Sequence, residues 1–199
     1  MERTNAFRKE QALDPAKVDR ALERAARRFA GFMAKTGKVG HAADGRRPAE
    51  RAAAQGYDYC IVSENIAYQY RSQGFASADA LARELVEGWK KSPGHRRNMV
   101  DPAVTETGVG VAQGEGGRWF AAQMFGRPKS ASIRFSVRNR SGEPVDYRVG
   151  QDRYSLSPRV TRTHAICGPA EVSIAQFQAK AVDGARYTVT AEGVVHGRR

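Results

Sequence analysis

Apolar residues recur at helical spacing in the stretch "LDPAKVDRALERAARRFAGFMAKTGK". Positions three or four apart along one side are apolar, which predicts an amphipathic helix; they are Val18, Leu22, Ala25, Phe29 and Phe32. Asp14 is the expected N-cap and Pro15 the expected first helical residue, because an Asx side chain accepts from the orphan N–H groups and proline pre-sets the helical φ. Gly37 is expected to end the helix.

Two further stretches predict helices. "RPAERAAAQGY" indicates a short helix that begins at Pro48 and stops at Gly56. "SADALARELVEGWKKSP" indicates a longer one that starts at Ser77 and ends before Pro93. Its apolar residues share one face and are expected to pack on a core; they are Leu81, Leu85 and Trp89.

The pattern then changes to strands. "TGVGVAQ" and "RWFAAQMFG", joined by "GEGG", predict a hairpin. After residue 129 apolar and polar residues alternate in "SIRFSVRN", "VDYRV", "AEVSIAQF" and "RYTVTAEGV", as they do in half-buried strands. The sequence therefore predicts an α+β chain, with a first domain over residues 1–128 and a small β-sandwich-like, all-β module over residues 129–199.

Composition and charge indicate which classes of protein the sequence fits. Of 199 residues, 41% are hydrophobic and 27% charged, which is typical of a globular chain. No run of about 18 apolar residues exists that would cross a membrane. The net charge of +12 favours anionic partners. No zinc finger, phosphate-binding glycine loop or RNA-binding motif accompanies it, so sequence-specific nucleic-acid binding is not predicted, and a diffusely charged solvated surface is the simpler interpretation.

The two cysteines, Cys60 and Cys167, lie far apart and form no C-x-x-C motif. They would form one disulfide in an oxidising compartment or remain buried thiols in the cytosol. The first residues, "MERTNAFRKEQ", lack the apolar core of a signal peptide. A cytosolic protein and a mature exported chain both fit this start.

Several polar motifs of the first domain occur in a specific order: "GHAADGRRPAERAAAQGY", "SENIAY", a tryptophan followed by "SPGHRRNM", and "TGVGVA" before "FAAQMFG". Together they resemble the CAP superfamily of cysteine-rich secretory, antigen 5 and plant pathogenesis-related proteins, over about residues 5–127. The similarity is greatest to its bacterial, SCP-like extracellular branch. The resemblance implies an α-β-α sandwich around an antiparallel sheet.

The resemblance also implies a cleft that holds two histidines and acidic residues. By motif position the cleft residues are His41, Glu64 and His95, and in this family such residues bind zinc or another divalent metal in some members. The family's second glutamate usually lies three residues after the tryptophan; counted from Trp89, that position is Ser92. A metal bound by His41, Glu64 and His95 would therefore have three protein ligands. The alternative is that each side chain is separately hydrogen-bonded.

Other residues of the first domain carry smaller expectations. Ser92 is expected to cap a short helix that begins at Pro93, which would place His95 on its first turn. Asn65 and Asn98 are expected to tie loops to the backbone. For the two tyrosines of "SENIAYQY", core packing is the preferred interpretation and a groove lining the alternative; they are Tyr68 and Tyr70. In the second module, His164 and His196 are expected to be structural or surface residues.

The resemblance implies an exported protein, periplasmic or extracellular, and favours a non-catalytic binding module. Expected ligands are a lipid, an anionic envelope polymer, another small ligand or a divalent metal. The alternative is a metal-dependent hydrolase or protease that uses the same cleft. In that case either a ligand or the base is missing, and no G-x-S-x-G motif supplies a serine nucleophile. Export also favours a Cys60–Cys167 disulfide that fastens the second module to the first.

Overall fold

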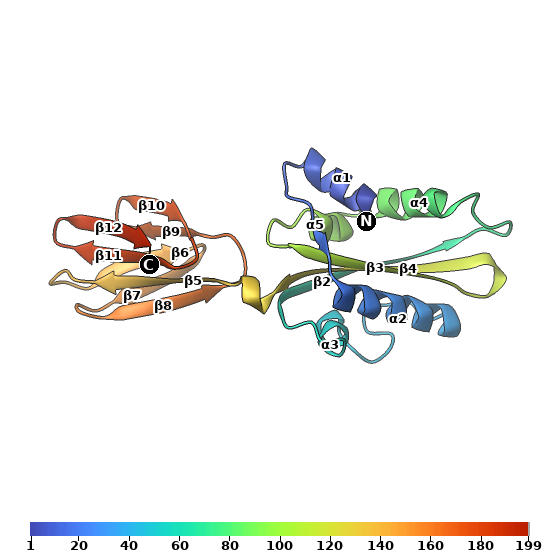
Figure 1. Ribbon diagram of the computed structural model, residues 1–199, viewed down its shortest axis with the longest axis horizontal. Coiled ribbons are helices and arrows are strands. Elements are labelled where there is room, and N and C mark those ends of the chain that lie inside the picture. Colours follow the sequence, from blue (N-terminus) through green and yellow to red (C-terminus); the bar gives the residue numbers. More distant parts are fainter. Residues whose placement is uncertain (199) are drawn as a thin grey trace. The chain divides into compact units, whose positions relative to one another are not determined.

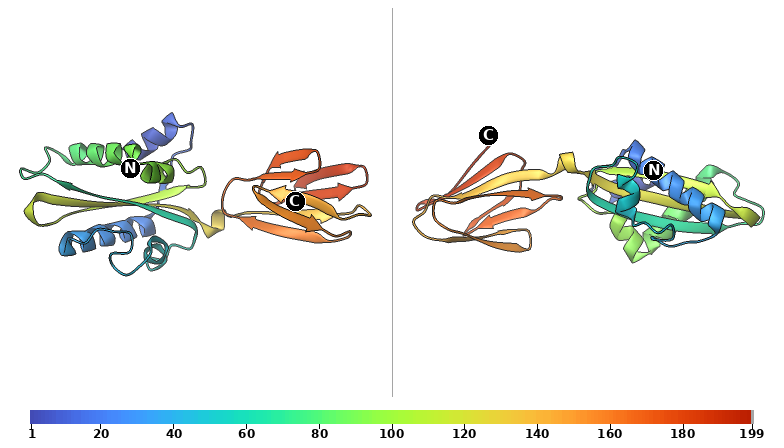
Figure 2. Two further views of the ribbon diagram at one scale, coloured as in Figure 1. Left: turned by 180° about the vertical axis from the view of Figure 1, so that it is seen from behind. Right: turned by 90° about the horizontal axis from the view of Figure 1, so that it is seen from below.

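The computed structural model describes residues 1–198 and divides the chain into two compact units, Met1–Ser130 and Ala131–Arg199. The N-terminal unit contains all the α-helices of the described residues, and the C-terminal unit consists of strands (Figure 1 and Figure 2). No helix within residues 1–198 is long and apolar enough to cross a membrane. The predicted α+β class, with an all-β module at the C-terminal end, is confirmed.

The N-terminal unit is a three-layer α-β-α sandwich. Its sheet has the strand order β1-β3-β4-β2, with β1 parallel to β3 and the other pairs antiparallel. The strands are β1 (Lys17–Val18), β2 (Tyr59–Tyr70), β3 (Glu106–Gln113) and β4 (Arg118–Pro128), with a 3-10 turn, Glu115–Gly117, between the last two. One face carries α2 (Arg20–Thr36) and α3 (Pro48–Ala53); the other carries α1 (Glu2–Glu10), α4 (Ala78–Lys91) and α5 (Pro93–Met99) (Figure 1).

The start of α2 differs from the sequence prediction. Asp19, not Asp14, is the N-cap, and its carboxylate accepts from the backbone N–H groups of Ala21 and Leu22, both at 2.8 Å. The chain before it is extended, because Lys17 and Val18 pair with β3 instead of entering the helix. Val18 is consequently 56% exposed and does not belong to the buried stripe. The predicted end is confirmed, since Gly37 has a φ of +69° at the C-cap.

The other predicted helix starts are confirmed. Ser77 caps α4 by accepting from the N–H of Ala80 at 3.1 Å, and proline opens both α3 and α5. The helix α3 ends at Ala53, slightly before the predicted stop at Gly56.

In the N-terminal unit the sequence did not predict α1, β1 or the long strand β2 that carries "SENIAY", and in the C-terminal unit it did not predict β7, β8, β10 or most of β12. The buried residues of β2 are consecutive (Glu64, Asn65 and Ile66) because helices cover both faces of the sheet. A strand that is buried on both faces shows no apolar alternation. Its sequence therefore lacks the signal by which a half-buried strand is recognised.

Glycines in "TGVGVA" let α2 approach β3 closely. A Cβ built on Gly108 would lie 2.1 Å from the backbone N of Glu23, and one on Gly110 would lie 2.2 Å from the backbone N of Arg27. The helix backbone therefore rests directly on the strand at two successive positions of one strand face. This contact brings α2 and the loop that follows it onto the sheet.

The C-terminal unit is a pair of four-stranded sheets. One has the order β10-β9-β6-β7 and the other β12-β11-β5-β8. The strands are β5 (Ile133–Asn139), β6 (Val145–Val149), β7 (Asp152–Leu156), β8 (Thr161–Ile166), β9 (Glu171–Ile174), β10 (Phe177–Lys180), β11 (Ala185–Thr190) and β12 (Gly193–Arg198); a 3-10 turn, Lys129–Ala131, precedes them. Apolar residues of both sheets form one core, which includes Phe135, Val149, Ile174 and Tyr187.

The two lone histidines of the C-terminal unit have the structural and surface positions expected of them. His164 is 7% exposed, shares a hydrogen bond with the Tyr147 hydroxyl at 2.7 Å, and stacks on the Phe135 ring. His196 is exposed on β12 and stacks on the Tyr187 ring with centroids 4.9 Å apart. Neither position suggests catalysis.

We expect the C-terminal unit to lose stability in acid because of His164. Burial and the nearby Arg162 cation lower the pKa of His164 below its ordinary value of 6.5. Between pH 6.5 and that lower pKa the unfolded chain binds more protons than the folded one, so the free energy of unfolding falls as the pH falls through this window. Above it the His164 contribution is complete. Urea unfolding at about pH 7.5 and about pH 5.5, followed by the methyl NMR signals of Val137 and Val189, measures the change.

The matched variant for this experiment is His164→Gln, which keeps a hydrogen-bonding side chain near Tyr147 but does not titrate. It should reduce the loss of stability between the two pH values. An equal loss in the variant and the wild type would assign the acid sensitivity to other groups.

The Cys60–Cys167 disulfide stays a prediction. Cys60 belongs to β2 in the N-terminal unit and Cys167 follows β8 in the C-terminal unit. We expect intact-mass measurement of the unreduced chain, after a thiol-alkylating reagent is added under denaturing conditions, to show no alkylation. Reduction should add two alkyl groups. Two alkylated thiols in carefully handled, unreduced protein would contradict the bridge.

Candidate functional site

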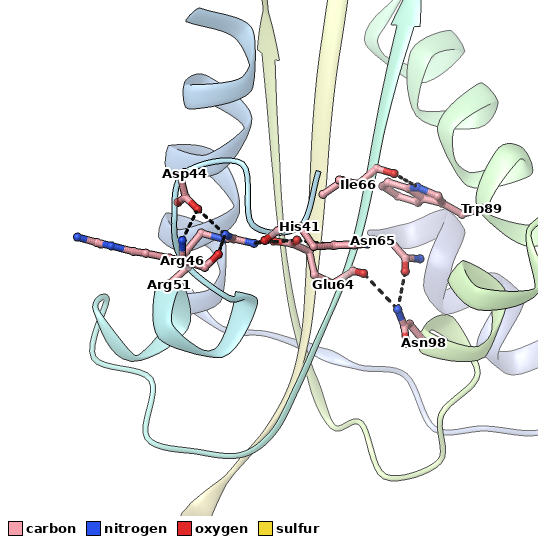
Figure 3. Close-up of polar contacts among 9 residues, drawn as sticks. All are labelled: His41, Asp44, Arg46, Arg51, Glu64, Asn65, Ile66, Trp89 and Asn98. Carbon is pink, nitrogen blue, oxygen red and sulfur yellow. Dashed lines mark hydrogen bonds and ion pairs between the residues drawn. The ribbon is translucent and has the colours of Figure 1, made fainter. Parts of the chain in front are cut away.

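The centre of the candidate site is Glu64, whose side chain is fully buried on β2. A buried carboxylate needs a charge partner, and Arg51 of α3 supplies it. The Arg51 Nη2 group donates to both carboxylate oxygens of Glu64, at 2.8 and 2.7 Å (Figure 3). The negative charge of Glu64 is therefore compensated inside the protein.

Arg51 also fastens the loop between α2 and α3. Its Nη1 donates to the Asp44 carboxylate at 2.7 Å and to the Arg46 carbonyl at 2.6 Å, and its Nη2 donates to the His41 carbonyl at 2.8 Å (Figure 3). The guanidinium carbon lies 3.6 Å from the centroid of the Phe29 ring. Arg51 is only 4% exposed. One buried cation thus joins α2, α3, β2 and the loop that carries His41.

His41 forms the outer part of this cluster. Its Nδ1 donates to Oε1 of Glu64 at 2.9 Å, since a carboxylate oxygen only accepts. In a neutral imidazole this fixes Nε2 as the nitrogen with the lone pair. The His41 side chain is 52% exposed, so a buried glutamate orients a histidine that solvent can reach.

His95 lies on α5, and two asparagines connect its helix to β2. The Asn65 amide donates to the His95 carbonyl at 3.0 Å, and the Asn98 amide donates to the Glu64 carbonyl at 3.2 Å and to Oδ1 of Asn65 at 2.9 Å. The expected backbone-tying role of both asparagines is confirmed. Burial, and secondarily the His41 charge, lower the pKa of the His95 imidazole. Its neutral form is therefore favoured more strongly than that of a free imidazole.

The three residues implied by the family resemblance are brought together to different degrees. His41 and Glu64 share a hydrogen bond, whereas His95 is linked to Glu64 through backbone contacts of Asn65 and Asn98. Ser92 stands at the N-cap of α5, but its side chain forms no capping hydrogen bond, so that part of the prediction is wrong. Pro93 supplies the helix start without it.

Arg51 is the site residue that sequence reasoning missed. In "GRRPAERAAAQGY" it is one of three arginines, and nothing in the spacing marks it as the buried one. Its burial is seen only in the structure, where Arg51 is 4% exposed and its neighbour Ala52 is 0% exposed.

His41, Glu64 and His95 are not arranged as a three-ligand metal site. Within residues 1–198 no group of three or more His, Cys, Asp or Glu side chains is placed to hold a metal ion. Both oxygens of Glu64 already accept from Arg51, and Oε1 also accepts from His41. What remains for a metal is Nε2 of His41 and the imidazole of His95, with Glu64 behind His41 as an orienting carboxylate.

Ser63 is not placed to act as a nucleophile with this cluster. Ser63 is adjacent to Glu64 on β2, and successive side chains of a strand point to opposite faces of the sheet. The Ser63 hydroxyl is buried without a hydrogen-bond partner and cannot reach His41 from that face. Ser63 therefore does not complete a Ser-His-Glu arrangement with His41 and Glu64.

A second candidate site lies on the opposite face of the same sheet. An apolar pocket of about 360 Å³ lies between α4 and the strands β3 and β4. Its lining includes Leu81, Ala82, Leu85, Val86 and Trp89 of α4, and Val109, Val111, Trp119 and Gln123 of the sheet. The volume is within the range of small-molecule pockets, about 300 to 1,000 Å³. Its walls favour a hydrocarbon ligand.

Comparison of the sequence with known proteins identifies the family to which the chain belongs. The model of the cysteine-rich secretory protein family, CAP, matches residues 1–125. The Bacillus subtilis protein YkwD, which is itself described as uncharacterized, is 30% identical over 128 residues. The match covers 64% of this chain but only 46% of YkwD, so the chain spans about half the length of that relative.

Two solved structures have a similar N-terminal fold. An outer surface protein from Borrelia burgdorferi has a TM-score of 0.56 at 18% identity, covering 64% of this chain and 89% of that one. An extracellular protein containing an SCP domain from Bacillus anthracis has a TM-score of 0.50 at 24% identity, covering 62% of this chain and 37% of that one. At these identities the likeness is one of fold.

Proposed function

Because the chain belongs to the cysteine-rich secretory protein family, CAP, we propose that it is an exported bacterial member that binds the hydrocarbon chain of a lipid and catalyses no reaction on it. It would act in the periplasm or outside the cell. The two solved neighbours are described as an outer surface protein and an extracellular protein, which agrees with such a location.

The apolar pocket beneath α4 is the observation that carries this proposal. Most of its lining side chains are aliphatic or aromatic, and the helix side of the pocket is formed by the buried stripe of α4. A hydrocarbon chain in this pocket would gain about 25 cal/mol for each Å² of apolar surface removed from water. The amide of Gln123 and the hydroxyl of Thr4, which are bonded to one another at 3.1 Å, supply little polar recognition.

The polar cluster supports binding over hydrolysis. Glu64 is held by Arg51 and His41, so its carboxylate is not free to take a proton from water. A metal-dependent hydrolase would need that carboxylate either as a ligand or as the base. In the arrangement observed, Glu64 instead stabilises the loop that carries His41.

Brominated lipid tests the proposal directly, because the two tryptophans of the chain, Trp89 and Trp119, both line the pocket. We expect dibromostearate to quench their fluorescence to a saturating level with one site per chain, and unbrominated stearate to compete with it. Ala82→Trp places a bulky side chain in the pocket and should abolish binding of radiolabelled stearate.

Ala54→Trp is the matched control, because Ala54 is exposed after α3 on the other face of the sheet. It should bind stearate like the wild type. Absence of both quenching and radiolabel retention in delipidated wild-type protein would refute the lipid proposal.

Metal binding at the polar cluster is a separate proposal, with His41 and His95 as the ligands and Glu64 as the orienting carboxylate. Two imidazoles without a third protein ligand should bind zinc weakly. We expect calorimetric titration of chelator-stripped protein to show micromolar or weaker binding that both His41→Ala and His95→Ala remove. Zinc binding that survives both changes would place the metal elsewhere.

A further inference from the structure

Two tyrosines near the end of β2 are exposed, although core packing was the preferred expectation. Tyr68 is 58% exposed and Tyr70 is 61% exposed. Both follow Glu64 and Ile66 at intervals of two residues, so all four side chains lie on the face that α2 covers. Ile66 packs into the core with α2, whereas the tyrosines are exposed.

The end of α2 explains this exposure. Gly37 terminates the helix and itself lines the groove that contains both tyrosines. The hairpin of β3 and β4 extends past the last turn of α2 (Figure 1). Among residues 1–198 no helix covers this face of the sheet beyond that turn (Figure 1), and the tyrosine rings are left exposed.

The groove has a volume of about 510 Å³. Phe120 is buried beneath it, with its ring centroid 6.3 Å from that of Tyr68. Val39 on the loop after α2 is 44% exposed and also lines the groove. Arg118 pairs with Tyr70 across β4 and β2 and, among residues 1–198, is the one charged residue of the lining.

The Arg118 cation is available to a ligand. Within residues 1–198 its guanidinium forms neither an ion pair nor a side-chain hydrogen bond, in contrast to the neighbouring Arg71, which is paired with Glu84. Guanidinium groups bind carboxylates and phosphates through two parallel hydrogen bonds. An anionic group bound in this groove would therefore meet an available cation.

The lining indicates which kind of ligand fits. A tyrosine ring offers an apolar face and a polar hydroxyl, which matches the mixed surface of a pyranose ring. A hydrocarbon chain would leave two hydroxyls and a guanidinium without partners. A stable protein interface buries about 1,200 to 2,000 Å² and needs a wider surface than a groove of this kind.

We propose that the groove formed by Tyr68, Tyr70 and Arg118 binds a segment of an acidic polysaccharide. Sugar rings stack on the two tyrosines, and a carboxylate of the glycan pairs with Arg118. The site lies on the opposite face of the sheet from the apolar pocket, so its test does not depend on lipid binding. An acidic polymer would also be attracted by the net charge of +12, and the groove would be the place where it binds specifically.

The test uses hexagalacturonate, its fully methyl-esterified form and a glutamate hexapeptide, each titrated by calorimetry into the full chain. We expect hexagalacturonate to bind, the ester to bind more weakly and the hexapeptide not to bind. Changing both tyrosines to alanine should weaken hexagalacturonate binding by about tenfold or more, and changing both to phenylalanine by no more than about threefold. Arg118→Gln should weaken binding of the acid but not of the ester.

Tyr59→Ala is the matched control, because Tyr59 is 39% exposed at the other end of β2 and outside the groove. It should leave hexagalacturonate binding unchanged. Equal weakening by Tyr59→Ala, equal binding of the hexapeptide, or no binding of hexagalacturonate by the wild type would each overturn the proposal. Unaltered tryptophan fluorescence in every variant verifies that the N-terminal unit is folded.

Discussion

Gly108→Ala and Gly110→Ala are each expected to destabilise the N-terminal unit by at least about 3 kcal/mol, the upper end of the usual cost of overpacking. The added methyl groups would lie 2.1 Å and 2.2 Å from backbone nitrogens of α2. A backbone cannot turn away as a side chain does, so the whole helix would have to move off the sheet. Urea unfolding followed by tryptophan fluorescence measures the loss, because Trp89 and Trp119 both belong to this unit.

Gly88→Ala supplies the control for these two changes. Gly88 is an exposed residue inside α4, and a Cβ there would have no neighbour within 4 Å. Alanine should stabilise this helix by about 0.5 to 1 kcal/mol, because it removes the entropic cost of glycine. Normal stability in Gly108→Ala and Gly110→Ala would show that α2 does not rest on β3 as described.

Arg51→Met is expected to cost about 3 to 5 kcal/mol, the usual result of removing one partner of a buried ion pair. Methionine retains much of the arginine stem but leaves the fully buried Glu64 carboxylate with His41 as its remaining side-chain partner. The change also removes the donors to Asp44 and to two carbonyls of the loop. Tryptophan-detected urea unfolding measures the loss of stability of this unit.

A double-mutant comparison separates the unpaired charge from the lost packing. Glu64→Gln removes the negative charge while keeping the shape of the side chain, so Arg51→Met combined with Glu64→Gln should be more stable than Arg51→Met alone by more than about 1 kcal/mol. If the double variant is no more stable, the ion pair between Arg51 and Glu64 does not account for the effect.

The Arg51 variant also bears on the candidate site. Arg51 binds the carbonyl of His41 and both oxygens of Glu64, so without it the His41 ring should lose its fixed orientation. We expect broader NMR signals for His41 in Arg51→Met at a urea concentration at which the unit remains folded. This would make Arg51 a positioning residue for the cluster.

The amino-acid sequence determined the features that depend on neighbouring residues. Helix starts at Ser77 and Pro48, the end at Gly37 and the β3–β4 hairpin follow from local capping, proline and glycine preferences. The alternation after residue 129 was sufficient to predict an all-β unit, since a half-buried strand repeats every two residues. The ordered motifs of the first domain identified the family.

Tertiary contacts decided what local patterns could not. Pairing of Lys17 and Val18 with β3 moved the start of α2 to Arg20, and covering helices on both faces removed the alternation that would have revealed β2. In the folded unit it is Arg51, and not one of the neighbouring arginines, that is buried beside Glu64 and compensates its charge. Because α2 ends before the end of the sheet, Tyr68 and Tyr70 remain exposed. Burial and charge pairing depend on residues distant in the chain, so only the folded structure shows them.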